Sequence, residues 1–301
     1  MIHSRISMRT PPRFRFWRTV HSHGWSSLAP FEIDHGTRSL GVALRIPNGT
    51  VVHCSLRGGP HAIIAALTSK NPLRNDERDE IRRQIAGILR VDDDLSEFYA
   101  ESRRYRKYRW IATSGAGRLM RAGSVFEDAV KMMCTTNCSW SLTQAMVRNL
   151  SLELGDRLEG FAAFPTASAI AQTTELFLRK KIRAGYRSPY LLEFARRVAS
   201  GALDVEAWRQ SNLGTGDLYE QITSVKGMGP YAAGNLLRLL GRYDYLALDS
   251  WVRKQYYAKY HGGRKVRDET IERRYEPLGP WRGLFFWLDM TREWLALESP
   301  F

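Results

Sequence analysis

Two glycines one residue apart mark the segment of this 301-residue chain whose residue types are best suited to chemistry. Gly227 and Gly229 stand in the run Lys226-Gly227-Met228-Gly229-Pro230. A Gly-x-Gly pair between two helices permits a very tight turn whose backbone N–H groups point outward beside a helix N-terminus. Such a nest of donors binds a phosphate oxygen without any side-chain charge. The segment therefore predicts a phosphate site, although an ordinary helical corner has the same signature.

Two helices must hold this turn in place. The first is expected to end near Val225, and Pro230 suits the first turn of the second, where its missing N–H needs no partner. Apolar residues recur in the second helix at helical spacing, and Gly241 is well placed to end it. The sequence therefore predicts a helix–turn–helix unit over this part of the chain.

Three aspartates follow at different kinds of position. Asp249 directly precedes an expected helix over Ser250 to Lys259, where an N-cap Asp stabilises the helix by about 1 kcal/mol. Asp244 lies in a polar turn, as turn chemistry favours. Asp289 lies in an aromatic helix and is expected to be paired or on the surface.

Strand patterns dominate the first part of the chain and helical patterns the rest. Strand-like runs at Leu40–Ile46 and Val51–Leu56 flank an Asn48-Gly49 pair, the strongest short hairpin signal, and His61–Leu67 adds a strand or begins a helix. From Ile81 onward, apolar residues recur at helical spacing. Ser124 and Glu127 form a capping-box pattern at a helix start. Helices are expected over residues 126–136, 142–150, 174–181, 189–199 and 203–210. The pattern predicts an α+β chain with a disordered basic lead-in (1–19), an antiparallel β domain with its following helix (20–95) and an α-helical region (96–301).

Composition narrows the class of protein and of partner. The formal charge of +14 permits a polyanion partner, and the lead-in carries five arginines and no acid. No apolar run approaches the roughly 18 residues that span a membrane. Three cysteines cannot form a disulfide framework or a four-cysteine iron–sulfur site within one chain. We therefore expect a cytoplasmic protein, associated with the nucleoid in a bacterium.

The segment from Val225 to Ala233 resembles the helix–hairpin–helix of the HhH-GPD DNA glycosylase superfamily. Members carry an aspartate after the hairpin, and Asp249 matches it in the loop 242–249. Two further segments, Phe164-Pro165-Thr166 and Pro280-Trp281-Arg282, resemble 3-methyladenine glycosylase II more weakly. The loop from Thr135 to Ser139 resembles the 8-oxoguanine glycosylases as strongly as these segments resemble 3-methyladenine glycosylase II. The resemblance implies a mostly helical glycosylase core with an N-terminal antiparallel β domain.

The chemistry implied is removal of a damaged base from duplex DNA. Such an enzyme extrudes the nucleotide from the stack, at a cost of a few kcal/mol. Breaking the N-glycosidic bond develops positive charge on the sugar, which a nearby carboxylate stabilises while orienting water. The resemblance gives Asp249 this role and makes Asn137 a candidate to fill the vacated stack. Helix C-capping explains Asn137 equally well.

Other residues are expected to contact DNA or the base. DNA contacts are assigned to Gly227, Gly229, Lys226, Asn137, Arg253 and Lys254. A base pocket is expected to draw on Trp140, Trp251, Trp281 and Phe285. Most buried aromatic residues are simply core, so each pocket assignment competes with that explanation.

Tyr231 occupies the position at which bifunctional members place a lysine. That lysine attacks the sugar and goes on to cut the strand, whereas a phenol cannot form a Schiff base. The resemblance therefore implies a monofunctional enzyme without AP-lyase activity. No cysteine follows Asp249, so no iron–sulfur cluster is expected, and a monovalent cation at the hairpin is a further expectation.

The expected function is a monomeric DNA N-glycosylase of base excision repair acting on double-stranded DNA, with alkylated purines favoured. An 8-oxoguanine-type glycosylase with AP-lyase activity is one alternative. A non-catalytic DNA-binding protein with the same hairpin is another. An RNA-binding protein using the arginine-rich N-terminus explains neither the hairpin nor Asp249.

Overall fold

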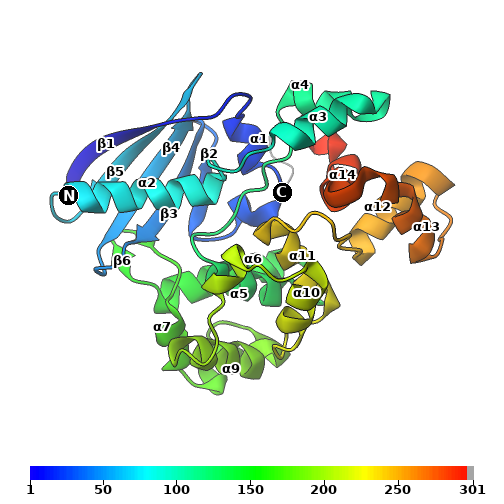
Figure 1. Cartoon of the computed structure of the whole chain (residues 1–301). Helices are drawn as coiled ribbons and strands as arrows, with labels where there is room; N and C mark the ends of the chain where they lie inside the picture. Colours follow the sequence, from blue (N-terminus) through cyan, green and yellow to red (C-terminus); the bar gives the residue numbers. More distant parts are fainter. Residues whose placement is uncertain (297–301) are drawn as a thin grey trace.

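A five-stranded antiparallel sheet forms the first of three lobes in the computed structural model, which describes residues 1–296 (Figure 1). The spatial order of its strands is β1-β5-β4-β3-β2. Arg45 pairs with Val51 across the turn, and Gly49 there has a φ of +89°, so the predicted hairpin is confirmed. The strands are β1 (Ile2–Arg9), β2 (Phe31–Asp34), β3 (Ser39–Arg45), β4 (Val51–Gly58) and β5 (Ala62–Ser69).

The N-terminal residues belong to this sheet. Ile2 to Arg9 pair with β5 along their whole length, and Phe16 begins the short helix α1 (Phe16–Val20) with its side chain buried. Strand periodicity explains the order: Ile6 faces the core while the arginines of β1 face solvent. The prediction of a disordered lead-in over residues 1–19 is therefore wrong.

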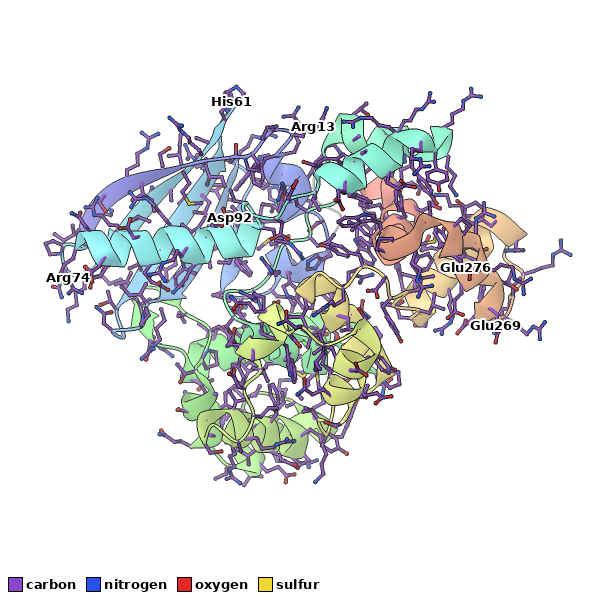
Figure 2. All side chains as sticks on the ribbon, viewed as in Figure 1. Arg13, His61, Arg74, Asp92, Glu269 and Glu276 are labelled. Carbon is purple, nitrogen blue, oxygen red and sulfur yellow. The ribbon has the colours of Figure 1, made fainter. Side chains whose placement is uncertain are left out.

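Helix α2 (Asn75–Leu89) lies along the sheet and covers its core. Its apolar stripe of Ile81, Ile85, Ile88 and Leu89 is fully buried, as the spacing predicts. Arg74 and Asp92, labelled in Figure 2, flank its two ends. We call β1–β5 with α1 and α2 the sheet lobe.

The second lobe contains the predicted helix–turn–helix unit and is called the hairpin lobe. Its core is shared mainly by α5, α6, α9, α10 and α11, and Ser124 caps α5 by accepting a hydrogen bond from the Glu127 N–H at 3.0 Å. The expected helix over 203–210 is instead a 3₁₀ turn at Glu206–Gln210. The lobe consists of α5 (Val125–Thr135), α6 (Trp140–Leu154), a small ribbon of β6 (Arg157–Leu158) and β7 (Phe161–Ala162), α7 (Ala167–Ala171), α8 (Glu175–Lys180), α9 (Ser188–Ala199), α10 (Thr215–Thr223) and α11 (Pro230–Leu240).

The third lobe joins two distant parts of the sequence around an aromatic core. Helices α3 (Ser96–Arg104) and α4 (Arg109–Ser114) pack with α12 (Ser250–His261), α13 (Asp268–Tyr275) and α14 (Arg282–Met290). We call this the C-terminal lobe. The region predicted as one helical unit from residue 96 onward thus has two cores. Within residues 1–296 no helix is both long and apolar enough to cross a membrane.

Candidate active site

A cavity of about 850 Å³ opens where the hairpin lobe meets the start of α12. We call it the cleft. The hairpin turn, Tyr231 and Asp249 all line it, although the aspartate lies 20 residues beyond Gly229 in the sequence. The other residues of the lining are Met133, Thr135, Thr136, Asn137, Cys138, Tyr186, Arg187, Tyr190, Pro230, Ala232, Leu248, Ser250, Trp251 and Arg253.

The two glycines of the hairpin are required for different reasons. Gly227 has a φ of +89°, and a Cβ there would lie 2.8 Å from the Cβ of Tyr190, so both backbone strain and crowding exclude a side chain. Gly229 has a φ of −72°, and a Cβ there would meet no atom within 4 Å. Nothing inside the protein explains Gly229, which stands exposed at the N-cap of α11. An approaching phosphate would explain it, because α11 presents its first N–H groups there.

Asp249 is the N-cap of α12, as predicted. One carboxylate oxygen accepts a hydrogen bond from the Val252 N–H at 2.9 Å. The residue is half-buried on the wall of the cleft. Capping holds the side chain in one place while leaving it in contact with the cavity. Both roles considered for Asp249 are therefore compatible with one position.

The charge of Asp249 affects the pKa of two residues on α11, Tyr231 and Arg238. Although 39% of Tyr231 is exposed, desolvation of its hydroxyl raises its pKa, and Asp249 raises the pKa further against a hydrogen bond with Thr135. Burial lowers the pKa of Arg238 to about 10, and the charge of Asp249 is the largest opposing effect. Tyr231 is therefore a neutral phenol at neutral pH, and Arg238 is a buried cation.

Asn137 lies on the cleft wall, one residue beyond Thr136, the C-cap of α5. Its φ of +45° is left-handed, so it performs the C-terminal role expected of Asn there. Its Nδ2 donates to the Tyr186 hydroxyl at 3.3 Å, and Tyr186 is 48% exposed. Arg187 ties this segment to α5 through a hydrogen bond of 3.3 Å to the Thr136 hydroxyl. Asn137 thus lies beside an exposed aromatic ring that the sequence analysis did not identify. Tyr186 belongs to a single 3₁₀ turn, Gly185–Arg187.

Three of the predicted DNA contacts are cationic side chains, and they differ in the ion pairs that they form within the protein. Arg253 donates two hydrogen bonds to Asp268, at 2.8 and 2.6 Å. Lys226 forms an exposed ion pair with Glu193 at 3.2 Å. Lys254 is exposed on α12, and no ion pair of its side chain occurs among the described residues. Of the three, Lys254 can reach a phosphate with the least rearrangement.

Of the four predicted pocket aromatics, only Trp251 lines the cleft. Trp140 donates to the Ser27 hydroxyl at 3.2 Å and packs against Gly24. Trp281 stacks on Tyr243, and Phe285 is fully buried between Phe98 and Tyr108. These three do not line the cavity that holds Asp249, contrary to the prediction, because they fill lobe cores or contacts between elements.

Trp287, whose ring packs against that of Trp251, is a second aromatic residue that the sequence analysis did not single out. Its ring centroid lies 6.0 Å from that of Trp251, and the Arg238 guanidinium lies 3.8 Å from its ring centroid. Trp287 also donates to the Ser22 backbone oxygen at 3.1 Å. An arginine of α11, Arg238, is therefore stacked on a tryptophan of α14, Trp287, which lies 49 residues further along the sequence.

Comparison with known proteins identifies the fold. No family model matches the chain. A DNA-3-methyladenine glycosylase of Bacillus subtilis is 23% identical over 193 residues, which cover 62% of this chain and 63% of that protein, less than two thirds of its length.

Solved structures match nearly the whole chain. The 3-methyladenine DNA glycosylase from Archaeoglobus fulgidus superposes with a TM-score of 0.77 at 19% identity, covering 97% of this chain and 99% of that one. The apo 8-oxoguanine glycosylase/lyase of Clostridium acetobutylicum gives a TM-score of 0.73 at 17% identity, covering 95% of each chain. This chain therefore has the helix–hairpin–helix fold of the DNA glycosylases.

Proposed function

We propose that this protein is a DNA N-glycosylase that extrudes a damaged base from duplex DNA and hydrolyses its N-glycosidic bond. The observation that carries the proposal is that Asp249 and the phosphate-binding type of turn at Gly227 and Gly229 line one cavity. The names of the similar proteins agree with this chemistry. The charge of +14 suits a polyanion such as DNA.

Each part of the cleft has a distinct task in this proposal. The hairpin turn holds a backbone phosphate near the lesion through N–H groups at the start of α11. Asn137 and the exposed ring of Tyr186 occupy the space that the extruded nucleotide leaves in the stack. Asp249 faces the sugar, stabilises its developing positive charge and accepts a proton from the attacking water.

The enzyme is proposed to be monofunctional. Tyr231 stands at the position of the lyase lysine, and no lysine is among the described residues that line the cleft. Borohydride reduction during turnover is expected to leave the protein unmodified. A covalent protein–DNA adduct would contradict the monofunctional proposal, and its abolition by Lys226→Met or Lys254→Met would identify the amine.

Alkylated purines are the favoured substrate class, because the Bacillus subtilis relative and the Archaeoglobus fulgidus structure are both 3-methyladenine glycosylases by name. The likeness to an 8-oxoguanine glycosylase/lyase keeps 8-oxoguanine as the second candidate. A panel of duplexes, each with one damaged base, tests both by abasic-site formation. Duplex binding without base release from any lesion would favour a non-catalytic DNA-binding protein.

A further inference from the structure

Three cations of the C-terminal lobe lie around one tyrosine of α12. The carbon of the Arg274 guanidinium lies 3.6 Å from the centroid of the Tyr260 ring. The ammonium groups of Lys107 and Lys259 lie 5.6 and 5.8 Å from the same centroid. Lys107 belongs to the turn between α3 and α4, Lys259 to α12 and Arg274 to α13, so packing between distant segments brings the three charges together. We call these four residues the cation cluster.

Asp289 is the carboxylate that forms ion pairs with this cluster. Its oxygens lie 2.9 Å from the Lys259 ammonium and 3.6 Å from that of Lys107, and Arg274 forms no ion pair with any residue that the structure describes. The hydroxyls of three tyrosines also donate to Asp289, so little of its hydrogen-bonding capacity remains. Three positive charges are therefore compensated by one negative charge, and the cluster keeps an excess of positive charge.

The acidic residues of α13 do not supply the missing negative charge, because they line a different cavity. This cavity has a volume of about 470 Å³, and the acids of the helix and its C-cap that line it are Asp268, Glu269, Glu272 and Glu276. Figure 2 labels Glu269 and Glu276. Arg273 lines the same cavity, whereas the next residue, Arg274, lies over Tyr260. The acids of α13 therefore compensate Arg273 and leave Arg274 to the cation cluster.

The three cations are accessible to an anion from solvent. Their side chains are 46% exposed in Lys107 and 37% exposed in Lys259, and Arg274 is exposed. Burial lowers the pKa of Lys107, the charge of Asp289 opposes this, and the charges of Arg274 and Lys259 lower the pKa further. Repulsion between like charges is stronger at a protein surface than in water, because the effective dielectric constant is lower. An anion bound here would relieve this repulsion.

The cluster lies outside the cleft but on a helix that begins in it. Arg253 lines the cleft, and Tyr260 follows it by seven residues on α12, so the two share a face of the helix about 10 Å apart along its axis. Each strand of a DNA duplex carries one phosphate for every 3.4 Å or so of its axis. A duplex that extends a few base pairs past the cleft is therefore long enough to bring a further phosphate to the cluster.

We propose that the cation cluster is a second phosphate site, separate from the hairpin turn, in which Lys107, Lys259 and Arg274 bind the oxygens of one phosphate group. The Arg274 guanidinium can donate two parallel hydrogen bonds, and each lysine adds a point charge. The phosphate comes either from the DNA backbone beside the cleft or from a free phosphate compound, since both present the same charged oxygens. Only the DNA source rests on the function proposed above.

Isothermal titration with inorganic phosphate at constant ionic strength tests the free source. The wild type is expected to bind phosphate, and Lys107→Met and Arg274→Met should each weaken binding about tenfold, because each removes a charge-assisted contact. The matched control is Arg273→Met, which removes one positive charge from the neighbouring position of the same helix but on the side of the acidic cavity. Its phosphate affinity should equal that of the wild type.

Titration of an undamaged duplex at several salt concentrations tests the DNA source. With a duplex of about 25 base pairs, Lys107→Met and Arg274→Met should each reduce the slope of log affinity against log salt by about one, because one phosphate contact is lost. Arg273→Met should leave the slope unchanged. All three side chains replaced here are exposed or half-exposed, and thermal unfolding checks that each variant is folded.

The outcomes separate the two sources and the two proposals. Loss of inorganic phosphate binding with an unchanged slope supports a free phosphate compound, and a reduced slope supports the DNA backbone. If Lys107→Met and Arg274→Met change neither quantity, or if Arg273→Met changes both equally, the second phosphate site is refuted. Neither measurement requires base release, so absence of base release from every lesion would refute the glycosylase proposal while leaving the result for the cation cluster intact.

Discussion

Two carboxylates in the C-terminal lobe, Asp249 and Asp289, differ in how their oxygens are satisfied. Asp289 accepts hydrogen bonds from the hydroxyls of Tyr108, Tyr260 and Tyr275 and from the Lys259 ammonium, at 2.7–3.2 Å. Asp249 accepts one hydrogen bond from a backbone N–H and otherwise lies on the wall of the cleft. A carboxylate enclosed by donors in this way has little hydrogen-bonding capacity left for a substrate. The comparison separates a carboxylate that builds the lobe from one that remains available for chemistry.

Asp249→Asn is expected to produce the largest loss of activity. An amide still caps α12 but carries no negative charge, so base release should fall about 10³-fold with little change in melting temperature. Single-turnover base release and thermal unfolding measure the two effects. Duplex affinity serves as the control and should be retained, and normal base release by the variant would refute the assigned role.

Asp289→Leu is the matched change in the satisfied carboxylate, and its main effect should be on stability. It leaves a lysine and three hydroxyls without their acceptor, so the free energy of unfolding should fall by about 3–5 kcal/mol. Urea denaturation measures the loss. A variant as stable as the wild type would show that the cluster around Asp289 contributes no net stability.

Lowering the pH should reveal how much the Asp289 cluster contributes to stability in the intact protein. Burial opposes ionisation of Asp289, but hydrogen bonds from Tyr275, Lys259 and Tyr260 outweigh it and lower its pKa below the usual 3.8. A depressed folded-state pKa stabilises the protein above pH 3.8, and that stability is lost as the pH falls toward the folded-state pKa. The melting temperature of Asp289→Asn is expected to fall less steeply below pH 3.8 than that of the wild type. Parallel curves for the two proteins would contradict this account.

The two hairpin glycines show a similar contrast. Gly227 is required by its surroundings within the protein, whereas Gly229 is not. Gly229→Ala meets no protein atom, so it should preserve stability and weaken duplex binding about tenfold by obstructing a phosphate. Gly227→Ala should lower stability as well, because of its φ of +89° and its contact with Tyr190. Fluorescence anisotropy and thermal unfolding separate these outcomes. Full duplex affinity in Gly229→Ala would exclude this turn as a phosphate site.

The smallest effect is expected from single cations. Lys254→Met should reduce the slope of log affinity against log salt by about one, because one exposed phosphate contact is lost. Arg253→Met should change the slope less, since Arg253 is already engaged by Asp268. Titrations at several salt concentrations measure both slopes. A larger change for Arg253 would show that its pair with Asp268 opens on DNA.

Local sequence determined the elements that carry the site. Gly-x-Gly followed by Pro230, with Gly241 at the far end, specifies a turn and a helix through backbone constraints alone, and α11 has these ends. Asp249 was recognisable for the same reason, because an N-cap depends only on the residues next to it. The Asn48-Gly49 hairpin is a third case.

Only the tertiary structure decided which side chains pack against Trp251 and Arg238. Trp287 lies 38 residues beyond Asp249, and no local pattern distinguishes it from Trp281, which packs on Tyr243 instead. Arg238 lies on a helix whose apolar spacing marks the core, and its burial beside Trp287 depends on how α11 and α14 meet. Residues 2–9 were predicted to be disordered, but they form β1. A strand with one polar face is fixed by pairing with its partner, here β5, which the local sequence does not show. Turns and helix caps depend on consecutive residues, whereas the side chains that come together around a cavity depend on packing between distant parts of the chain.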